Sequence, residues 1–348
     1  MAQTVGTELL NRQLICVEQG RARSDREHFS RALNLDCLCM VGALTRNQIL
    51  GYSALCLIWG STWLAIRVVV HDVPPLEAAA IRFLAGAVLL LALAAIGRRK
   101  WPSSSEQWKA LLVLSVTIMA VPYGLLFWAE QYVSSSMTAV LYSAMPLLVA
   151  LFTPLMMHHT VPRRAVFALV IASGGLLLLF PGGLSTNGRS LAGGAAILVS
   201  VLLSAWSVVY AKRHLHKIDS VVSTGLQLLF GSVVLLWGTW ALESHLHANW
   251  TRTASAAMAF LVLFGSCAAF VIYYWLLKTI QPYQLATISL ITPVIAVMEG
   301  ALLLRESIPL LMVMAIFVIL GSVGSVLLSP ADAESSQDNV LSDKGLAK

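Results

Sequence analysis

Ionisable side chains inside apolar segments are the residues of this sequence most able to do chemistry. Arg82 lies within one apolar segment and Glu299 within another, and Glu306 follows Glu299 by seven residues. Seven residues make two helical turns, so both acids lie on one helix face. A charge at mid-bilayer costs roughly 3 kcal/mol, and it therefore needs a partner or a function. We expect either a structural ion pair between Arg82 and one of these acids, or a coupling site in which Glu299 binds a proton.

Aromatic rings and small hydroxyls form a second group. Trp59 is followed by Ser61 and Thr62, and its counterpart Trp206, 147 residues later, is followed by Tyr210. Indoles at mid-span lie away from the membrane interface, where Trp is usually found, which favours the lining of a central cavity. Close helix packing is the alternative for the small residues. The predicted cavity residues are Trp59, Ser61, Thr62, Arg82, Tyr123, Trp128, Tyr142, Trp206, Tyr210, Tyr274 and Ser289, together with Pro146 and Pro293.

The two prolines lie at corresponding positions of two apolar segments. Proline removes a backbone donor and leaves a carbonyl without its usual partner. In lipid, such a carbonyl is tolerated only where protein or cavity water satisfies it. Pro146 and Pro293 therefore predict kinks near the midplane or the cavity wall, with a packing role alone as the alternative.

Sequence motifs of other reaction types are missing. The paired histidines have no Cys or acidic partners at the spacing of a metal site. The five cysteines are an odd number and do not indicate a disulfide framework. No Walker loop, Gly-x-Ser-x-Gly elbow or His-Glu-x-x-His motif occurs. We therefore expect no metal, no cofactor, no enzymatic activity and no ATP-driven transport.

The elements that must position these residues belong to an internal duplication. Each copy holds about five apolar segments, each near the ~20 residues that a membrane-spanning helix needs. Because five is odd, the second copy enters the membrane from the opposite side, and the two copies are expected to be inverted repeats. Residues 147 positions apart match without a gap: Trp59 and Trp206, Phe83 and Phe230, Trp128 and Trp275, Ala139 and Ala286, Pro146 and Pro293, Pro162 and Pro309, and Gly174 and Gly321.

We therefore predict an all-α membrane protein with ten transmembrane helices, arranged as two inverted five-helix repeats. The composition agrees, because 58% of the residues are hydrophobic, 11% are charged and the mean hydropathy is +0.78. Soluble domains carry about 25% charged residues. The expected helices span residues 49–70, 76–96, 110–128, 136–157, 165–181, 191–211, 220–242, 256–277, 284–304 and 310–328.

Loop charges indicate the orientation in the membrane. Lys and Arg concentrate in alternate connections, which places these connections and both termini in the cytoplasm. We expect a multi-pass protein of the cell inner (plasma) membrane. Since the net charge of +6 is carried largely by such loops, we expect no nucleic-acid partner. The basic residues concerned are Arg98, Arg99, Lys100, Arg163, Arg164, Lys212, Arg213, Lys217 and Lys278.

The two ends of the chain differ in composition from the rest. Residues 1–46 are rich in Arg and lack the continuous apolar core of a signal peptide. Met40 begins a stretch that leads directly into the first expected helix, so we expect either a start at Met40 or a cytoplasmic extension over residues 1–46. The two repeats are expected over residues 47–181 and 182–330, and a disordered cytoplasmic tail over residues 331–348.

Short motifs in a fixed order carry a family resemblance. They are Ile58-Trp59-Gly60-Ser61-Thr62-Trp63, Pro74-Pro75, Ile81-Arg82-Phe83, Thr292-Pro293-Val294-Ile295-Ala296, Gly300 and Arg305-Glu306-Ser307. With the duplication, the sequence resembles the EamA-like branch of the drug/metabolite transporter superfamily over residues 49–328. The resemblance implies a ten-helix inner-membrane carrier of small metabolites, often amino acids or their derivatives, that works by alternating access at a central cavity. The positions matched to the family are Trp59, Arg82, Pro146, Pro293 and Glu306.

Two positions depart from the family pattern. His159 stands where the family tends to keep an acid, and Glu299 stands where an apolar residue is expected. Both departures bear on gating and coupling, which the resemblance therefore leaves open.

An integral membrane enzyme acting on lipid-linked substrates is the alternative function. Such an enzyme would gather acids, His or Ser at one membrane face, whereas here the polar residues lie at mid-span in both repeats. The expected partners are the lipid bilayer and a small-molecule substrate, neutral or zwitterionic because the first helix carries no carboxylate for a cation. Substrate identity, transport direction, coupling ion and oligomeric state stay open.

Overall fold

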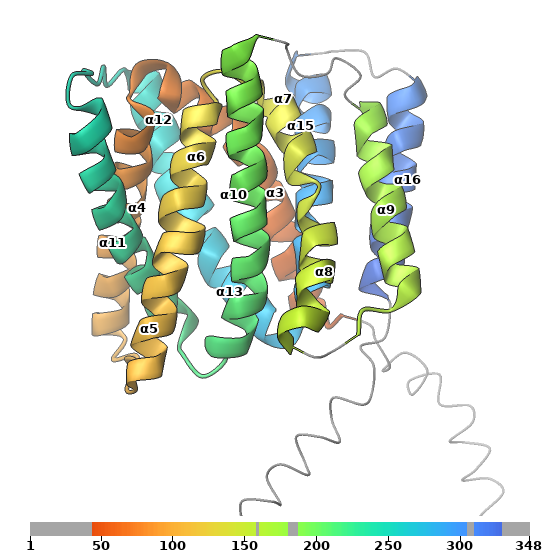
Figure 1. The fold of residues 1–348 in the computed structure, drawn as a ribbon, viewed down its shortest axis with the longest axis horizontal. Coiled ribbons are helices and arrows are strands. Elements are labelled where there is room, and N and C mark those ends of the chain that lie inside the picture. Colours follow the sequence, from red (N-terminus) through yellow and green to blue (C-terminus); the bar gives the residue numbers. More distant parts are fainter. Residues whose placement is uncertain (1–43, 158–159, 180–186, 305–309, 329–348) are drawn as a thin grey trace, which may run out of the picture. The chain divides into compact units, whose positions relative to one another are not determined.

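The computed structural model describes residues 44–157, 160–179, 187–304 and 310–328. All of them belong to the unit Leu44–Lys348, which the contacts of the chain separate from Met1–Ala43. The described residues form helices and no strand. In chain order these are α3 (Arg46–Asp72), α4 (Pro75–Ile96), α5 (Ser105–Leu114), η1 (Ser115–Ala120), α6 (Val121–Ala129), α7 (Ser135–Tyr142), α8 (Met145–Met157), α9 (Arg163–Leu179), α10 (Gly188–His214), α11 (Ser220–Gly238), η2 (Thr239–Glu243), α12 (Arg252–Phe260), η3 (Leu261–Ala268), α13 (Ala269–Thr279), α14 (Pro282–Ala286), α15 (Ile288–Leu304) and α16 (Leu310–Leu327), with η1, η2 and η3 π-helical (Figure 1).

Eight helical stretches within the described residues are long and apolar enough to cross a membrane. They are Arg46–Asp72, Pro75–Ile96, Ser105–Ala129, Met137–Met157, Gly188–His214, Ser220–Glu243, Arg252–Thr279 and Leu310–Leu327. The all-α membrane class is therefore confirmed. The two other expected helices, 165–181 and 284–304, fall on α9, which has 17 residues, and on α14 and α15, which are separated at Thr287. The count of ten crossings stays a prediction.

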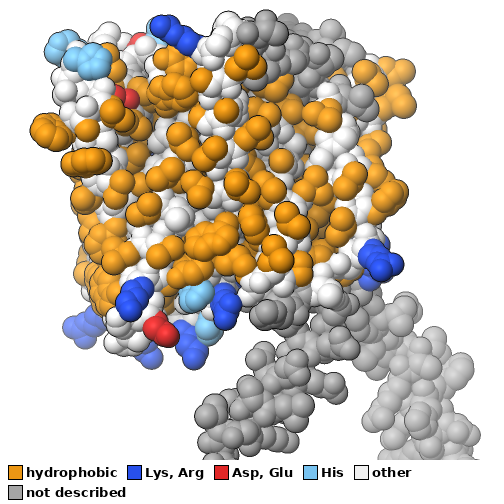
Figure 2. Space-filling view, viewed as in Figure 1, with side chains coloured by type: hydrophobic (Ala, Val, Ile, Leu, Met, Phe, Trp, Pro, Cys, Tyr) orange, Lys and Arg blue, Asp and Glu red, His pale blue; other side chains and the backbone are white. Residues whose placement is uncertain are grey.

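Hydrophobic side chains cover the sides of the helices between two more polar ends (Figure 2). Leu64, Phe167, Trp237 and Phe317 are among the large apolar residues that are mostly exposed. Soluble proteins rarely expose so continuous an apolar surface, whereas lipid tails solvate it. Lys and Arg side chains gather at the lower end in the view of Figure 2.

The order of the helices repeats with the 147-residue offset of the sequence. α5 begins at Ser105 and α12 at Arg252, and the π-helical segments η1 and η3 follow at Ser115 and Leu261. Corresponding helices also pack against each other, α4 against α11 and α9 against α16. A helix meets its own copy in this way where a pseudo-two-fold axis passes between the two.

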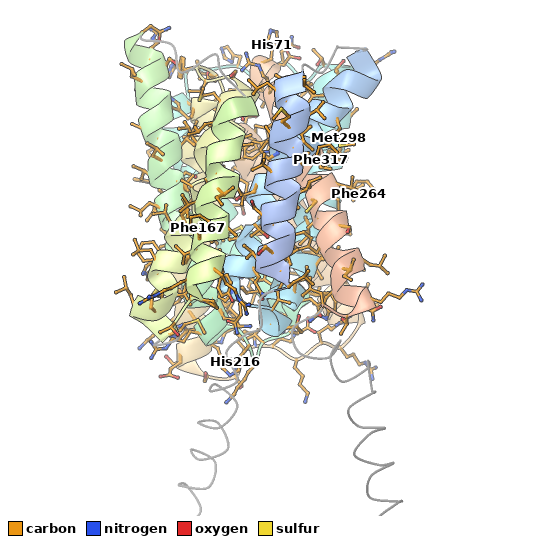
Figure 3. All side chains as sticks on the ribbon, turned by 90° about the vertical axis from the view of Figure 1, so that its right-hand side faces the viewer. His71, Phe167, His216, Phe264, Met298 and Phe317 are labelled. Carbon is orange, nitrogen blue, oxygen red and sulfur yellow. The ribbon has the colours of Figure 1, made fainter. Side chains whose placement is uncertain are left out.

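The corresponding helices α3 and α10 run in opposite directions. His71, in the last turn of α3, lies at one end of the helices, and His216, just after α10, lies at the other end (Figure 3). Repeats with inverted topology require this relation between equivalent helices.

Polar side chains fix where several helices begin. Thr45 and Ser104 accept from the N–H groups of Gln48 and Gln107, and both form capping boxes at the starts of α3 and α5. The caps of α10, α11 and α12 are Asn187, Asp219 and Thr251. Since a cap satisfies donors that a helix N-terminus leaves free, each long apolar run starts as a helix at a defined residue.

Polar contacts join α4 and α11 at both ends of this pair. Arg99 Nη1 donates to Asp219 Oδ2 at 3.0 Å. At the opposite end, the Glu243 carboxylate accepts from the backbone N–H of Leu76 at 3.0 Å and of Glu77 at 3.1 Å. The two contacts link the first half of the chain to the second on each side of the membrane-spanning segments.

The pKa of Asp219 lies below its ordinary value. Partial burial raises this pKa, but hydrogen bonds from the N–H groups of Val222 and Val221 and from Arg99 together outweigh burial. The carboxylate therefore stabilises the fold above the unfolded-state pKa of about 3.9. This stabilisation is lost as the pH falls through the lower folded-state pKa.

Asp219→Ala should lower the free energy of unfolding at pH 7 by about 1 kcal/mol, because the helix cap is lost. Asp219→Asn keeps a capping oxygen and removes only the charge, so it should cost less at pH 7 and flatten the pH dependence below pH 4. Thermal unfolding of the purified protein from pH 7 to pH 3 measures both effects. The same pH dependence in wild type and Asp219→Asn would contradict the assignment.

Candidate functional site

A partly enclosed pocket lies among helices of both halves of the chain. Its volume is about 100 Å³. Helices α3, α4, α6, α7 and α8 and the segment η1 line it from the first half, and α10, α13, α14 and α15 from the second. The lining residues are Trp59, Thr62, Trp63, Ile66, Arg82, Ile118, Tyr123, Leu126, Tyr142, Met145, Ser204, Phe270, Tyr273, Leu285, Ala286, Ile288, Ser289 and Thr292.

Arg82 is the charged residue of this pocket and is 1% exposed. Its Nε donates to Ser266 Oγ at 2.8 Å, and its Nη2 donates to the Gly265 carbonyl at 3.0 Å. The guanidinium carbon also lies 5.3 Å from the centroid of the Tyr123 ring. Cation–π contacts of this kind stabilise a positive charge that has lost its water.

Within the part of the chain that the structure describes, no acidic side chain forms an ion pair with Arg82. The ion pairs found there join His71 to Asp72 and Arg99 to Asp219. Nη1 of Arg82 has no hydrogen-bond partner in the described part of the chain. The pocket lining therefore contains a cationic group with one nitrogen whose donors are unused among the described residues.

Aromatic rings form one wall of the pocket. Trp59 lies 5.2 Å from Tyr273 and 5.7 Å from Phe270 between ring centroids, and Tyr123 lies 5.9 Å from Phe270. Tilted and edge-to-face contacts at such distances stabilise the wall beyond the area that the rings bury. The wall offers a ligand a preformed apolar surface.

The π-helical segments supply backbone carbonyls to side chains of other helices. Gly265 in η3 accepts from Arg82 and, at 3.4 Å, from Trp59 Nε1. In η1, the carbonyl of Thr117 accepts from Ser207 Oγ at 3.0 Å. Short π-helical turns shift the helical hydrogen-bond pattern and frequently occur at functional sites. Here they occur at nearly corresponding positions of the two halves and beside the pocket.

Side-chain hydroxyls also line the pocket, and they form hydrogen bonds within the protein. Thr62 donates to the Trp59 carbonyl at 2.8 Å, and Ser289 donates to the Ala286 carbonyl at 2.9 Å. The hydroxyls of Tyr142 and Ser200 share a hydrogen bond of 2.7 Å between α7 and α10. A hydroxyl that donates to a backbone carbonyl still offers an acceptor oxygen to a ligand.

Six of the residues that the sequence predicts for a cavity line this pocket: Trp59, Thr62, Arg82, Tyr123, Tyr142 and Ser289. They come from α3, α4, α6, α7 and α15, so tertiary packing brings together segments far apart in the chain.

The other predicted cavity residues lie elsewhere. Ser61 Oγ donates to the Leu57 carbonyl, and Trp128 packs against Tyr132. Trp206 stacks on Tyr210, which in turn stacks on His214. Tyr274 donates to Gln227 Oε1 at 2.7 Å, and Pro146 and Pro293 are buried in α8 and α15.

Sequence reasoning left several lining residues out of the predicted set, above all Trp63, Tyr273 and Phe270. Trp63 follows Trp59 by four residues and therefore lies on the same helix face. That spacing was a signal for Trp63. For Tyr273, nothing in the sequence separates it from its neighbour Tyr274.

The acids proposed for coupling lie beyond what the structure describes. The backbone of Glu299 belongs to α15, but its side chain is outside the described part, as are Glu306 and His159. The ion pair with Arg82 therefore stays a prediction. Among the described residues, no group of three or more His, Cys, Asp or Glu could hold a metal ion.

A helical membrane protein with a polar and aromatic pocket between its two halves belongs by architecture with solute carriers. Comparison with known families agrees: the model of the EamA-like transporter family matches residues 48–180 and again residues 191–328. The chain therefore belongs to the EamA-like transporter family, and the family resemblance seen in the sequence is confirmed.

Relatives support this assignment, and a solved structure supports the fold. The "Uncharacterized transporter YoaV" of Bacillus subtilis (strain 168) is 30% identical over 78% of this chain and 93% of its own length. The "Uncharacterized inner membrane transporter YedA" of Escherichia coli (strain K12) is 31% identical over 79% of this chain and 89% of its own length. A crystal structure of a protein with 17% identity superposes with a TM-score of 0.69, covering 82% of this chain and 99% of that one, which supports the fold.

These findings make the chain a multi-pass membrane transporter with a small-molecule substrate. Family and relatives point to transport rather than to catalysis.

Proposed function

We propose that this protein is a secondary transporter of small metabolites, such as amino acids or their derivatives, that works by alternating access at the pocket. The observation that carries the proposal is the composition of the pocket wall, which both halves of the chain build. If the two halves rock against each other, a pocket between them opens first to one side of the membrane and then to the other. Trp59, Thr62, Arg82, Tyr123, Tyr142 and Ser289 are the predicted cavity residues proposed to contact the substrate.

The proposed architecture has ten crossings in two inverted repeats, residues 47–181 and 182–330. The antiparallel course of α3 and α10 and the packing of α4 on α11 support inversion. In this arrangement α9 is the fifth crossing, and α14 with α15 is the ninth. In this proposal, either residues 1–46 form a cytoplasmic extension or translation starts at Met40. Residues 331–348 form a cytoplasmic tail.

We propose that both termini face the cytoplasm in the inner membrane. The Lys and Arg side chains at the lower end in Figure 2 support this orientation, since basic residues stay on the cytoplasmic side. A phosphatase fused after Asn249 should be active, and one fused after Lys100 should be silent. The reverse activities would contradict the orientation, and equal activities would contradict the opposite placement of these two positions.

Chemical block of the pocket tests the transport proposal. Ser289→Cys places a thiol in the pocket, and Leu64→Cys places one on α3 at a position that is 63% exposed on the apolar surface. Uptake of labelled amino acids and N-acylated amino acids into proteoliposomes should fall upon maleimide treatment of Ser289→Cys and stay unchanged in Leu64→Cys. Maleimide-treated wild type controls for the natural cysteines. Equal uptake by blocked and unblocked Ser289→Cys, with labelling verified by mass spectrometry, would refute the pocket as the route.

A further inference from the structure

Three buried polar atoms without hydrogen-bond partners among the described residues belong to side chains that line the pocket. They are Nε1 of Trp63, Nη1 of Arg82 and the hydroxyl of Tyr273. All three carry a hydrogen to donate. Buried donors are almost always satisfied in folded proteins, so a group of unused donors at one pocket indicates a ligand that accepts hydrogen bonds.

The charge of the pocket restricts this ligand further. Arg82 is a cation, and the described residues of the lining include no Asp, Glu, Lys or His. An anion would neutralise the buried guanidinium, whereas an organic cation would find no acidic partner among the described lining residues. A single positive charge matches one negative charge, and a guanidinium edge matches the planar oxygens of a carboxylate.

Two contacts fix the guanidinium of Arg82 and leave one of its nitrogens without a partner in the described part of the chain. Nε and Nη2 are fixed by Ser266 and the Gly265 carbonyl, which leaves Nη1 as the remaining donor nitrogen. A side chain fixed in this way loses little freedom when a ligand binds. The Tyr123 ring beside the guanidinium limits how far the group can move.

The rest of the pocket selects the uncharged part of the ligand. The rings of Trp59, Tyr123, Phe270 and Tyr273 face the same space, and an apolar or aromatic group would pack against them. Among the described residues, the lining offers no carboxylate to an ammonium group. Acids without a free amine therefore fit better than zwitterions.

We propose that the pocket binds an organic monocarboxylate, with its carboxylate on Arg82, Trp63 and Tyr273 and its uncharged apolar or aromatic part against the ring wall. This inference rests on the proposed function and names the substrate class within it. Among amino-acid derivatives, it selects those whose amine is acylated or removed. Such anions depart from the neutral or zwitterionic substrate expected from the sequence.

Three small probes of similar shape and different charge test the inference: phenylacetate, phenylacetamide and phenethylamine. Quenching of tryptophan fluorescence in purified wild-type protein at pH 7 measures their binding, because Trp59 and Trp63 line the pocket. We expect phenylacetate to bind at least roughly tenfold more tightly than phenylacetamide, because losing a charge-assisted hydrogen bond costs an affinity ratio of this size. Phenethylamine should bind most weakly of the three. An amide or amine that binds as well as the acid overturns the inference.

Adjacent tyrosines supply a matched pair of variants. Tyr273→Phe removes the unused hydroxyl and keeps the ring, whereas Tyr274→Phe removes a hydroxyl that donates to Gln227. Phenylacetate affinity should fall roughly five- to tenfold in Tyr273→Phe. Affinity should stay unchanged in folded Tyr274→Phe. Equal affinity of both variants and wild type would contradict the role of Tyr273.

Arg82→Lys and Arg82→Gln test the anchor itself. Phenylacetate should bind more weakly to Arg82→Lys, which keeps the charge, and the preference for acid over amide should disappear in Arg82→Gln. If Arg82 served only in a structural ion pair, the folded variants would keep the preference for acid over amide, and this result would overturn the inference. If neither variant folds, the three probes on wild-type protein and the two tyrosine variants test the inference. Transport of the three probes can also be measured after maleimide treatment of Ser289→Cys. If the block stops transport of the amide or the amine but not of the acid, the inference is refuted and the transport proposal still holds.

Discussion

Replacing Trp59 by Ala should reduce the initial rate of transport by roughly tenfold or more, equivalent to about 1.4 kcal/mol of lost interaction. The indole lines the pocket and contacts both Tyr273 and Phe270, so its removal takes away part of the ring wall that a substrate would meet. Uptake into proteoliposomes measures the rate, and size-exclusion profiles with thermal unfolding show that the variant is folded. Unchanged transport in folded Trp59→Ala would remove Trp59 from the proposed site.

Trp206→Ala discriminates between the cavity role that the sequence predicts for Trp206 and the contacts that the structure gives it. Because Trp206 corresponds to Trp59 in the duplication, the sequence predicts the same loss of transport. The structure instead stacks Trp206 on Tyr210, with ring centroids 4.9 Å apart, and Trp206 is absent from the pocket lining. We therefore expect a small effect on transport, close to that of the lipid-facing control Trp237→Ala, which alters a ring that is 67% exposed. A loss as large as that of Trp59→Ala would restore the symmetrical cavity.

Replacing Gly231 by Leu should greatly lower the yield of folded protein. A Cβ at Gly231 would lie 2.7 Å from Met119 Cβ and 3.3 Å from the Ser115 carbonyl, so α11 and η1 would have to move apart. Overpacking a well-packed core typically costs about 1–3 kcal/mol, and here the obstacle includes backbone.

Gly321→Leu is the matched control for this prediction. Apart from its chain neighbours and the backbone of α16, no atom of the described residues lies within 4 Å of a Cβ at Gly321. This glycine is exposed on α16, so the same side chain should be accepted there. Fluorescence-detected size exclusion and melting temperature compare the two variants. Equal yield and melting temperature of Gly231→Leu and Gly321→Leu would show that α11 and η1 are less closely packed than the structure has them.

The helical membrane class and the family followed from the sequence because they depend on local and repeated features. A run of about 20 apolar residues is long enough to span a bilayer, whatever packs beside it. Caps such as Thr45 and Ser104 start helices through contacts within the next three residues. The 147-residue offset is likewise visible in the chain, and the family model matches both copies.

The sequence also indicated that Arg82 needs a partner or a function, because a charge in an apolar segment is costly in any fold. The sequence could not decide what Arg82 contacts. Ser266 and Gly265 are more than 180 residues away in the chain, and only the packing of α4 on η3 brings them to the guanidinium.

Tyr273 and Tyr274 mark the limit of sequence reasoning most clearly. Successive residues of a helix point about 100° apart, so one hydroxyl reaches Gln227 and the other belongs to a side chain lining the pocket. Duplication relates the positions of Trp59 and Trp206, yet it does not give them the same neighbours. The sequence determined which segments enter the membrane and how they repeat, since hydrophobicity is a property of the segment. The tertiary structure alone decided which side chains share the pocket and which donors stay unused there, because both depend on helix rotation and on contacts between the two halves.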